Sequence, residues 1–232
     1  MVLEPFGQKV FLTGGSGTLG TEIRKIFPTI IAPSSQECDI LSLDQLEGVM
    51  DLYKPSVFIH SAAFTDVTGA QSDSTHCIDV NVAGTINVVK ACRARGIKLV
   101  FVSTDYVFDG KRGNYSPEDP INPLSYYAKT KGAAELVVRT YPNHLVVRTS
   151  FFGYDFPYEK ALVDQWTTKD YVDVVAPKVL AAALSDKTGI IHVGSEKRSI
   201  YEIAKTRNGA VKAISIKDLS FPIPQDVSLK VE

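Results

Sequence analysis

The chain of 232 residues has little cysteine and no excess of either charge. Its three cysteines, Cys38, Cys77 and Cys92, are odd in number and show neither a Cys-x-x-Cys nor a Cys/His spacing, which argues against a disulfide framework and a zinc site. We therefore expect reduced, structural thiols and no metal site. With 25 basic and 26 acidic side chains, the composition also indicates no nucleic-acid or membrane-surface partner.

Long apolar runs are missing as well. The longer ones, such as Leu99 to Val102 and Val179 to Leu184, fall short of the ~20 residues that span a bilayer. The N-terminal Met-Val-Leu-Glu-Pro lacks the basic and apolar regions of a signal peptide. We expect a cytoplasmic protein that acts on a small molecule and has one sizeable core with a small appended lobe.

Short β-rich apolar runs alternate with helix-like segments from residue 9 to about residue 150, as in parallel βαβ units. This alternation predicts an α/β fold, a Rossmann-like doubly wound parallel sheet, over residues 1–150. The rhythm weakens in residues 151–232, which we assign to a small, abbreviated C-terminal substrate lobe, partly interleaved with the sheet. The expected strands are 9–13, 29–32, 57–61, 99–103, 145–149 and 189–193, the expected helices are 18–27, 43–53, 73–95, 125–141, 173–184 and 199–205, and residues 221–226 are expected to be turn or extended chain.

A glycine-rich loop, Thr13-Gly14-Gly15-Ser16-Gly17-Thr18-Leu19-Gly20, follows the first expected strand and opens a helix. Glycines at this junction allow a tight turn and close approach to a pyrophosphate, while the helix N-terminus supplies free N–H groups. The alternative is a glycine-rich loop without a ligand, which we rate below nucleotide binding in this position. No Gly-Lys-Ser/Thr follows, so a nucleoside-triphosphate P-loop is disfavoured. The residues assigned to the cofactor here are Gly14, Ser16, Gly17, Thr18, Leu19 and Gly20.

The segment that would face the adenosine ribose contains hydroxyl and carboxylate groups but no cation, because no lysine or arginine occurs from Ile26 to Tyr53. It leaves the choice between NADP(H) and NAD(H) open and predicts weak discrimination between them. Small side chains at the end of the third strand would let a cofactor lie flat, although they could serve helix packing alone. The further cofactor residues are Ser34, Asp39, Ile40, Ser61, Ala62, Ala63 and Asn81.

Two tyrosine–lysine pairs occur at a spacing that places both side chains on one helical face. Tyr127 and Lys131 follow a strand that ends in Ser103-Thr104, whereas Tyr201 and Lys205 lie near the C-terminus. We interpret the second pair as ordinary helix packing. In the first, Thr104 would bind a carbonyl oxygen, Tyr127 would deliver a proton, and Lys131 would lower the pKa of the phenol and bind the nicotinamide ribose.

These motifs occur in the order seen in extended short-chain dehydrogenases/reductases, and the chain resembles their dTDP-4-dehydrorhamnose reductase branch over roughly residues 8 to 153. The resemblance implies a cofactor, NADPH or NADH, the reactive trio of Thr104, Tyr127 and Lys131, and a nucleotide-sugar keto substrate. It rests on the glycine loop, Asp39-Ile40, Ser61-Ala62-Ala63, Asn81-Val82-Ala83-Gly84-Thr85, Ser103-Thr104-Asp105-Tyr106-Val107-Phe108-Asp109-Gly110, Tyr127 with Lys131, and Arg148-Thr149-Ser150.

The expected activity is reduction of the 4-keto group of a 4-keto-6-deoxy nucleotide sugar, by a protein that forms a homodimer. The segment between Phe152 and Asp164 is shorter than is usual in this family, which leaves the identity of the sugar open. Two alternatives remain: a bifunctional sugar-nucleotide epimerase/reductase, and a non-catalytic NAD(P)-binding regulatory subunit. The residues assigned to the substrate are Asp105, Val107, Phe108, Arg148 and Trp166.

Overall fold

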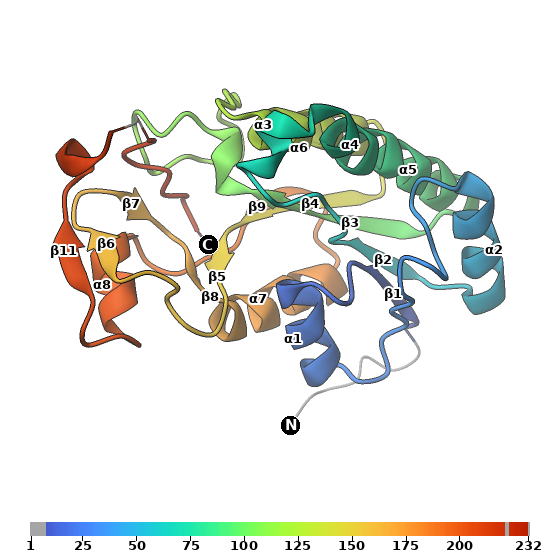
Figure 1. Ribbon diagram of the computed structural model, residues 1–232. Helices are drawn as coiled ribbons and strands as arrows, with labels where there is room; N and C mark the ends of the chain where they lie inside the picture. The colour runs from blue at the N-terminus through green and yellow to red at the C-terminus, as the bar shows by residue number, and fades with distance from the viewer. Residues whose placement is uncertain (1–7, 221–222, 232) are drawn as a thin grey trace.

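A computed structural model describes residues 8–220 and 223–231. A five-stranded sheet lies at its centre, between two layers of helices (Figure 1). Every strand pairs in parallel with its neighbours, so the predicted doubly wound α/β fold is confirmed. In sheet order the strands are β1 (Val10–Thr13), β2 (Val57–His60), β3 (Lys98–Thr104), β4 (His144–Thr149) and β9 (Gly189–His192).

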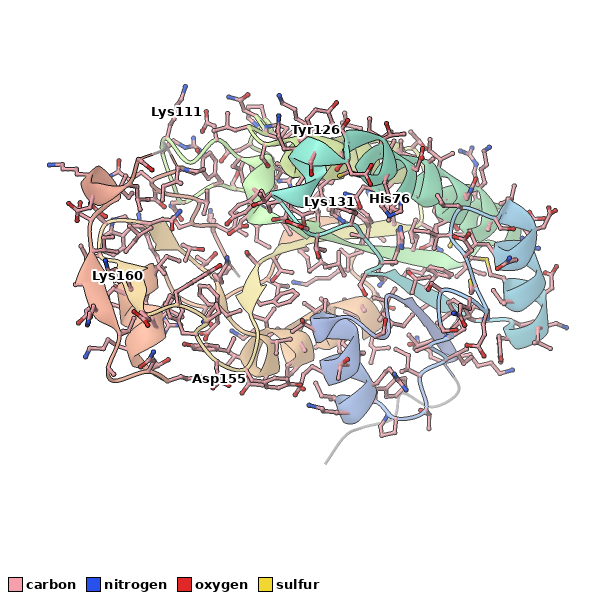
Figure 2. All side chains as sticks on the ribbon, in the orientation of Figure 1. His76, Lys111, Tyr126, Lys131, Asp155 and Lys160 are labelled. Carbon is pink, nitrogen blue, oxygen red and sulfur yellow. The ribbon has the colours of Figure 1, made fainter. Side chains whose placement is uncertain are left out.

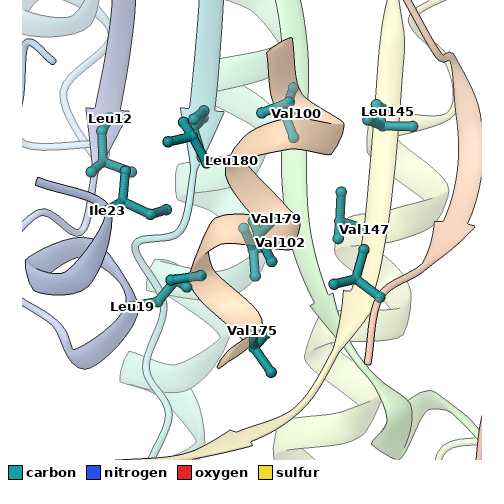
Figure 3. Close-up of a cluster of buried hydrophobic side chains, with 14 of the residues drawn as sticks. Leu12, Leu19, Ile23, Val100, Val102, Leu145, Val147, Val175, Val179 and Leu180 are labelled. Carbon is teal, nitrogen blue, oxygen red and sulfur yellow. The ribbon is translucent and has the colours of Figure 1, made fainter. Parts of the chain in front are cut away.

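Successive residues of each strand face opposite sides of the sheet and enter different cores. Leu12 and Val100 pack in the first core, whereas Phe11 and Phe101 pack in the second. Figure 3 shows the first core, where valine and leucine side chains of the strands meet two helices. Burial on both faces explains why these strands are continuous apolar runs.

Helices α1 (Thr18–Ile26) and α7 (Val172–Leu184) cover the first core. The other face carries α2 (Leu43–Tyr53), α5 (Gly84–Arg95) and α6 (Tyr126–Val138) (Figure 1). Polar residues at the N-caps set where α2 and α6 begin: the Ser42 hydroxyl accepts from the Gln45 amide, and the Ser125 hydroxyl accepts from the Ala128 amide.

Two sequence predictions in this half of the chain are wrong in part. The strand expected at 29–32 is reduced to a single bridge between Phe11 and Ile31, because Pro33 cannot donate to a ladder and follows at once. The helix expected at 73–95 is three pieces, of which the middle one is a π-helical turn. These are α4 (Ser74–Ile78), η1 (Asp79–Ala83) and α5; a short helix, α3 (Gly69–Ser72), precedes them.

Beyond residue 150 the chain crosses between the central sheet and a second lobe. Helix α7 and strand β9 belong to the sheet, while three two-stranded sheets and α8 (Ile200–Lys205) build the lobe. The boundary near residue 150 stays a prediction. The remaining elements are η2 (Asp105–Val107), β5 (Phe151–Phe152), β6 (Lys160–Leu162), β7 (Trp166–Thr167), β8 (Asp170–Tyr171), β10 (Arg198–Ser199), β11 (Lys212–Ile214) and η3 (Ile216–Asp218).

Two of the sequence predictions concern residues outside those the structure describes: the N-terminal Met-Val-Leu-Glu-Pro and the first two residues of the segment from Phe221. In the described residues, no helix combines the length and the apolar character that crossing a membrane requires.

Candidate active site

A cavity of about 920 Å³ opens along the carboxyl edge of the sheet, where ligands of doubly wound folds bind. Its volume suits a large cofactor. The glycine loop forms one wall, and the ends of β2 and β3 form others. Of the residues predicted to bind the cofactor or to react, the cavity is lined by Gly14, Ser16, Gly17, Thr18, Leu19, Gly20, Asp39, Ile40, Ser61, Ala62, Ala63, Thr104, Tyr127 and Lys131.

The physical reason for having glycine differs among the three motif positions, Gly14, Gly17 and Gly20. A Cβ on Gly14 would lie 2.7 Å from the Ala62 nitrogen, and Gly14 has a φ of +76°, so the turn itself requires glycine. A Cβ on Gly20 would lie 2.2 Å from the Gly14 carbonyl oxygen, so close packing requires glycine there too. At Gly17 a Cβ would meet nothing closer than 3.4 Å. The protein's own packing therefore leaves the space beside Gly17 free for a ligand.

Gly17 is also the N-cap of α1, and no side chain bonds to this end of the helix. The first-turn N–H groups and the positive end of the helix dipole are thus available to an anion. The free space beside Gly17, the helix N-terminus without a capping side chain and a cavity of this size together fit the pyrophosphate of a dinucleotide.

The wall expected to face the adenosine ribose differs in detail from the prediction. The backbone N–H and hydroxyl of Ser34 both donate to the Glu37 carboxylate at 2.8 Å, and Ser34 does not line the cavity. Ser35 lines it instead, together with Asp39. A cationic side chain from outside the segment 26–53 lies close to the glycine loop: the Arg24 Cδ is 3.5 Å from the position that a Cβ on Gly15 would take.

Thr104 and Tyr127 meet at the other end of the cavity. Thr104 ends β3, and its hydroxyl donates to the Asp105 carboxylate at 3.2 Å and accepts from the Tyr106 amide. Tyr127 lies in the first turn of α6 and lines the same cavity as Thr104. Burial, assisted by the negative charge of Asp105, raises the pKa of Tyr127 well above its ordinary value. The phenol is therefore protonated at neutral pH and has a proton to give.

Lys131 lies one turn further along α6 and is 3% exposed. Its ammonium donates to the Val102 carbonyl oxygen at 2.8 Å and lies 4.0 Å from the centre of the Phe101 ring. Figure 2 shows Lys131 in the interior of the molecule, whereas Lys111 projects from its edge. Burial lowers the pKa of Lys131 to about 7. Burial has the largest effect on the pKa of Tyr127 and raises it, and the expected lowering of that pKa by Lys131 stays a prediction.

Asn81, predicted to contact the cofactor, does not line the cavity. It is buried in η1, where its carbonyl oxygen accepts from the Phe64 amide at 2.8 Å and its amide group donates to the Thr130 hydroxyl at 2.9 Å. Asn81 thus ties the loop after β2 to the helix that carries Tyr127. Asn81 lies in a π-helical turn, a feature frequent at functional sites.

The predicted substrate residues are not gathered in one place. Asp105 is buried next to Thr104 and lines a second cavity. Val107 and Phe108 are fully buried in a small apolar cluster with Tyr115, and neither lines the two cavities. Their assignment to the substrate does not fit the structure, because η2 turns their side chains into the core.

Neither Arg148 nor Trp166 lines these two cavities, and Arg148 lines a separate cavity with Pro117 and Arg139. Arg148 is 1% exposed and forms an ion pair with the buried Glu135 of α6 at 2.9 Å. Trp166 pairs β7 with β10 in the second lobe. Arg148 therefore holds α6, the helix that bears Tyr127, against β4.

The second tyrosine–lysine pair lies on α8 in the other lobe. Tyr201 packs against the small core there, and the Lys205 ammonium is 5.8 Å from the centre of its ring. Neither residue lines either cavity. All three cysteines are free and buried, as expected. Within the described residues no group of three or more His, Cys, Asp and Glu side chains has the geometry of a metal site.

The second cavity, of about 200 Å³, lies between η2 and the C-terminal lobe. Two side chains, Tyr106 and Lys169, line both cavities and form the junction between them. Sequence reasoning missed both, as well as Ser150 at the end of β4. Tyr106 and Ser150 lie within motifs already noted, so their places at strand ends were a usable signal. Nothing in the sequence around Lys169 indicated a site.

Comparison with known proteins agrees with this geometry. Residues 8–183 match the family described as the RmlD substrate binding domain, which is most of the chain. The chain belongs to this family. The resemblance noted in the sequence agrees with the curated relatives, several of which are dTDP-4-dehydrorhamnose reductases.

Among curated relatives, the dTDP-4-dehydrorhamnose reductase of Aggregatibacter actinomycetemcomitans is 33% identical over 74% of this chain, and the alignment spans 61% of that relative's length. The methionine adenosyltransferase 2 subunit beta of Danio rerio is 31% identical over 61% of this chain and 47% of the relative. Among solved structures, a Bacillus anthracis dTDP-4-dehydrorhamnose reductase in complex with NADP has a TM-score of 0.86 at 25% identity, covering 97% of this chain and 91% of that one.

Proposed function

We propose that this protein is an NAD(P)H-dependent reductase of the 4-keto group of a 4-keto-6-deoxy nucleotide sugar, with dTDP as the nucleotide. The observation that carries the proposal is that Thr104 and Tyr127 line the same cavity as the glycine loop. A binding module has no need of a proton donor there. The names of the relatives, dTDP-4-dehydrorhamnose reductase among them, support the substrate class, and the NADP in the Bacillus anthracis structure supports the cofactor.

Bound NAD(P)H would supply the hydride, which ends on the carbonyl carbon of the sugar. The residues of this chain do the rest. Thr104 and Tyr127 would both hydrogen-bond the carbonyl oxygen, and Tyr127 would give its proton to that oxygen as negative charge develops there. The products are the alcohol and NAD(P)⁺.

Lys131 has a second task in this scheme. Its ammonium already donates to the Val102 carbonyl oxygen and has further protons available for ribose hydroxyls. Because the nearly neutral pKa of Lys131 comes from burial, a hydroxyl-rich ligand beside it would favour the charged form. A charged Lys131 would then stabilise the phenolate of Tyr127 after proton transfer.

The test is incubation of the protein with NADPH and a panel of 4-keto nucleotide sugars while the nicotinamide absorbance is followed. We expect the absorbance to fall with a dTDP-linked 4-keto-6-deoxy sugar and to stay constant without sugar. Exchange of solvent deuterium into the sugar ring during the reaction would favour the bifunctional epimerase/reductase instead.

A non-catalytic regulatory subunit is the second candidate, because one relative, methionine adenosyltransferase 2 subunit beta, is named as a subunit of an enzyme. Tight NADPH binding without turnover of any keto sugar would support it. The cytoplasmic location and the homodimer stay proposals. Analytical ultracentrifugation of the protein tests the homodimer.

A further inference from the structure

Lys169 is a cation at the junction of the two cavities. It lies in the turn between β7 and β8, and its side chain lines both the large cavity and the smaller one. Among the described residues, Tyr106 alone shares this position. A ligand that reaches from Tyr127 into the second cavity must therefore pass the Lys169 side chain.

The surroundings of Lys169 leave its ammonium available to a ligand. Its ammonium lies 5.6 Å from the centre of the Tyr106 ring, and the charge of Asp105 attracts it. The ammonium lies 4.7 Å from the centre of the Phe152 ring. An ammonium has three protons to donate, and contacts with two ring faces leave these protons available to an anionic ligand.

The second cavity beyond Lys169 has walls suited to a planar ring. Phe152, Phe156 and Tyr158 line it, and the Phe152 and Phe156 ring centres are 5.2 Å apart. Aromatic walls favour stacking, and the Gln165 side chain at the same cavity supplies amide hydrogen-bonding groups. A nucleobase has both properties, a flat face and hydrogen-bonding edges.

We propose that Lys169 binds the diphosphate of the nucleotide-sugar substrate, with the sugar at Tyr127 and the base in the aromatic cavity. The inference rests on the proposed function, since it takes a nucleotide sugar as the ligand. A diphosphate is the charged group between the sugar and the nucleoside, and Lys169 is the charged side chain between the two cavities. Lys160 of β6 lines the second cavity but not the first, and Figure 2 shows it in the C-terminal lobe.

The experiment measures the affinities of dTDP and of thymidine by titration calorimetry, with the protein saturated with NADP⁺. We expect the wild type to bind dTDP more tightly than thymidine. Lys169→Met should reduce that ratio of affinities about tenfold or more, because a hydrogen bond to a charged group is worth ~1.5–3 kcal/mol. Lys169→Arg should retain most of it. Lys160→Met, the matched control from the same cavity, should leave the ratio unchanged.

Removing Lys169 also removes a charge that attracts the buried Asp105. NADP⁺ affinity and the melting temperature of each variant therefore accompany the titrations, and the ratio of two affinities cancels a general loss of binding competence. The inference is overturned if Lys169→Met keeps the wild-type ratio, or if Lys160→Met alone abolishes it.

The turnover assay separates this inference from the proposed function. Turnover of a keto sugar together with an unchanged ratio in Lys169→Met would contradict the role of Lys169 and leave the reductase intact. A reduced ratio in a protein without turnover would support the diphosphate site and contradict the reductase.

Discussion

Two tyrosines in this chain share the same spacing from a lysine, yet the fold gives them different surroundings. Tyr127 meets Thr104 in the large cavity, and burial keeps its phenol protonated. Tyr201 packs in the small core of the C-terminal lobe. Spacing along a helix therefore predicts which side chains are neighbours but not what the pair faces.

We expect Tyr127→Phe to lower turnover by about 10² to 10⁴ and to leave NADPH affinity nearly constant, because the ring is kept while the transferable proton is lost. Steady-state kinetics and fluorescence titration with NADPH measure the two quantities. Tyr201→Phe is the matched control and should turn over like the wild type. Wild-type turnover in Tyr127→Phe would show that another group delivers the proton.

Burial of Lys131 predicts a pH-dependent stability. Its folded-state pKa of about 7 lies below the ordinary value of 10.5, so between these pH values the unfolded chain binds a proton that the folded chain lacks. The free energy of unfolding contributed by this residue therefore rises with pH across that window, and the penalty for burying the charge is full below it.

Urea unfolding of the cofactor-free wild type and of Lys131→Met tests this effect. The stability advantage of Lys131→Met should be largest at pH 7 and below and should shrink by about pH 9.5, since the penalty in the wild type is relieved as Lys131 is neutralised. Titration of other groups is common to both proteins and cancels in the difference. A difference that does not change with pH would mean that Lys131 titrates normally.

At the scale of elements, the glycine loop is the feature whose physical reason varies most from residue to residue. Gly14 and Gly20 are required by the turn and its packing, whereas Gly17 has free space beside it. Substitution at Gly17 thus separates ligand binding from folding.

Gly17→Val should reduce NAD(P)H binding below detection in titration calorimetry, because a side chain there would occupy the space proposed for the pyrophosphate. The circular dichroism spectrum should stay native. Gly48→Val on α2 is the control, since a Cβ there also meets nothing within 4 Å and the residue lies outside the cavity. Unchanged cofactor affinity in Gly17→Val would place the pyrophosphate elsewhere.

Elements with strong local signals were predictable from the sequence. The apolar runs of β1 and β3 and the serine caps of α2 and α6 carry their structure in neighbouring residues. The contacts of Asn81 with Phe64 and Thr130 were not predictable, because they join residues that are distant in sequence.

The same division holds for the site in the whole molecule. The glycine loop and the trio Thr104, Tyr127 and Lys131 were predictable because they lie at strand ends and helix starts. The residues that would surround the substrate were not predictable from the sequence. Arg148 forms an ion pair with Glu135 of another element. Lys169 reaches the junction of the two cavities because β8, which follows it, pairs with β5 just beyond the end of β4.

The central claim is that the whole molecule brings NAD(P)H and a keto sugar together so that a hydride passes to the carbonyl carbon. The most direct measurement is the transfer of deuterium from NADPH labelled at the nicotinamide C4 to the dTDP-linked 4-keto-6-deoxy sugar, followed by mass spectrometry and NMR of the product. We predict one deuterium at C4 of the sugar, and the same labelled product formed about 10² to 10⁴ times more slowly with Tyr127→Phe under conditions of equal cofactor binding. Oxidation of NADPH with no label in the sugar, or label at another carbon, would contradict the account.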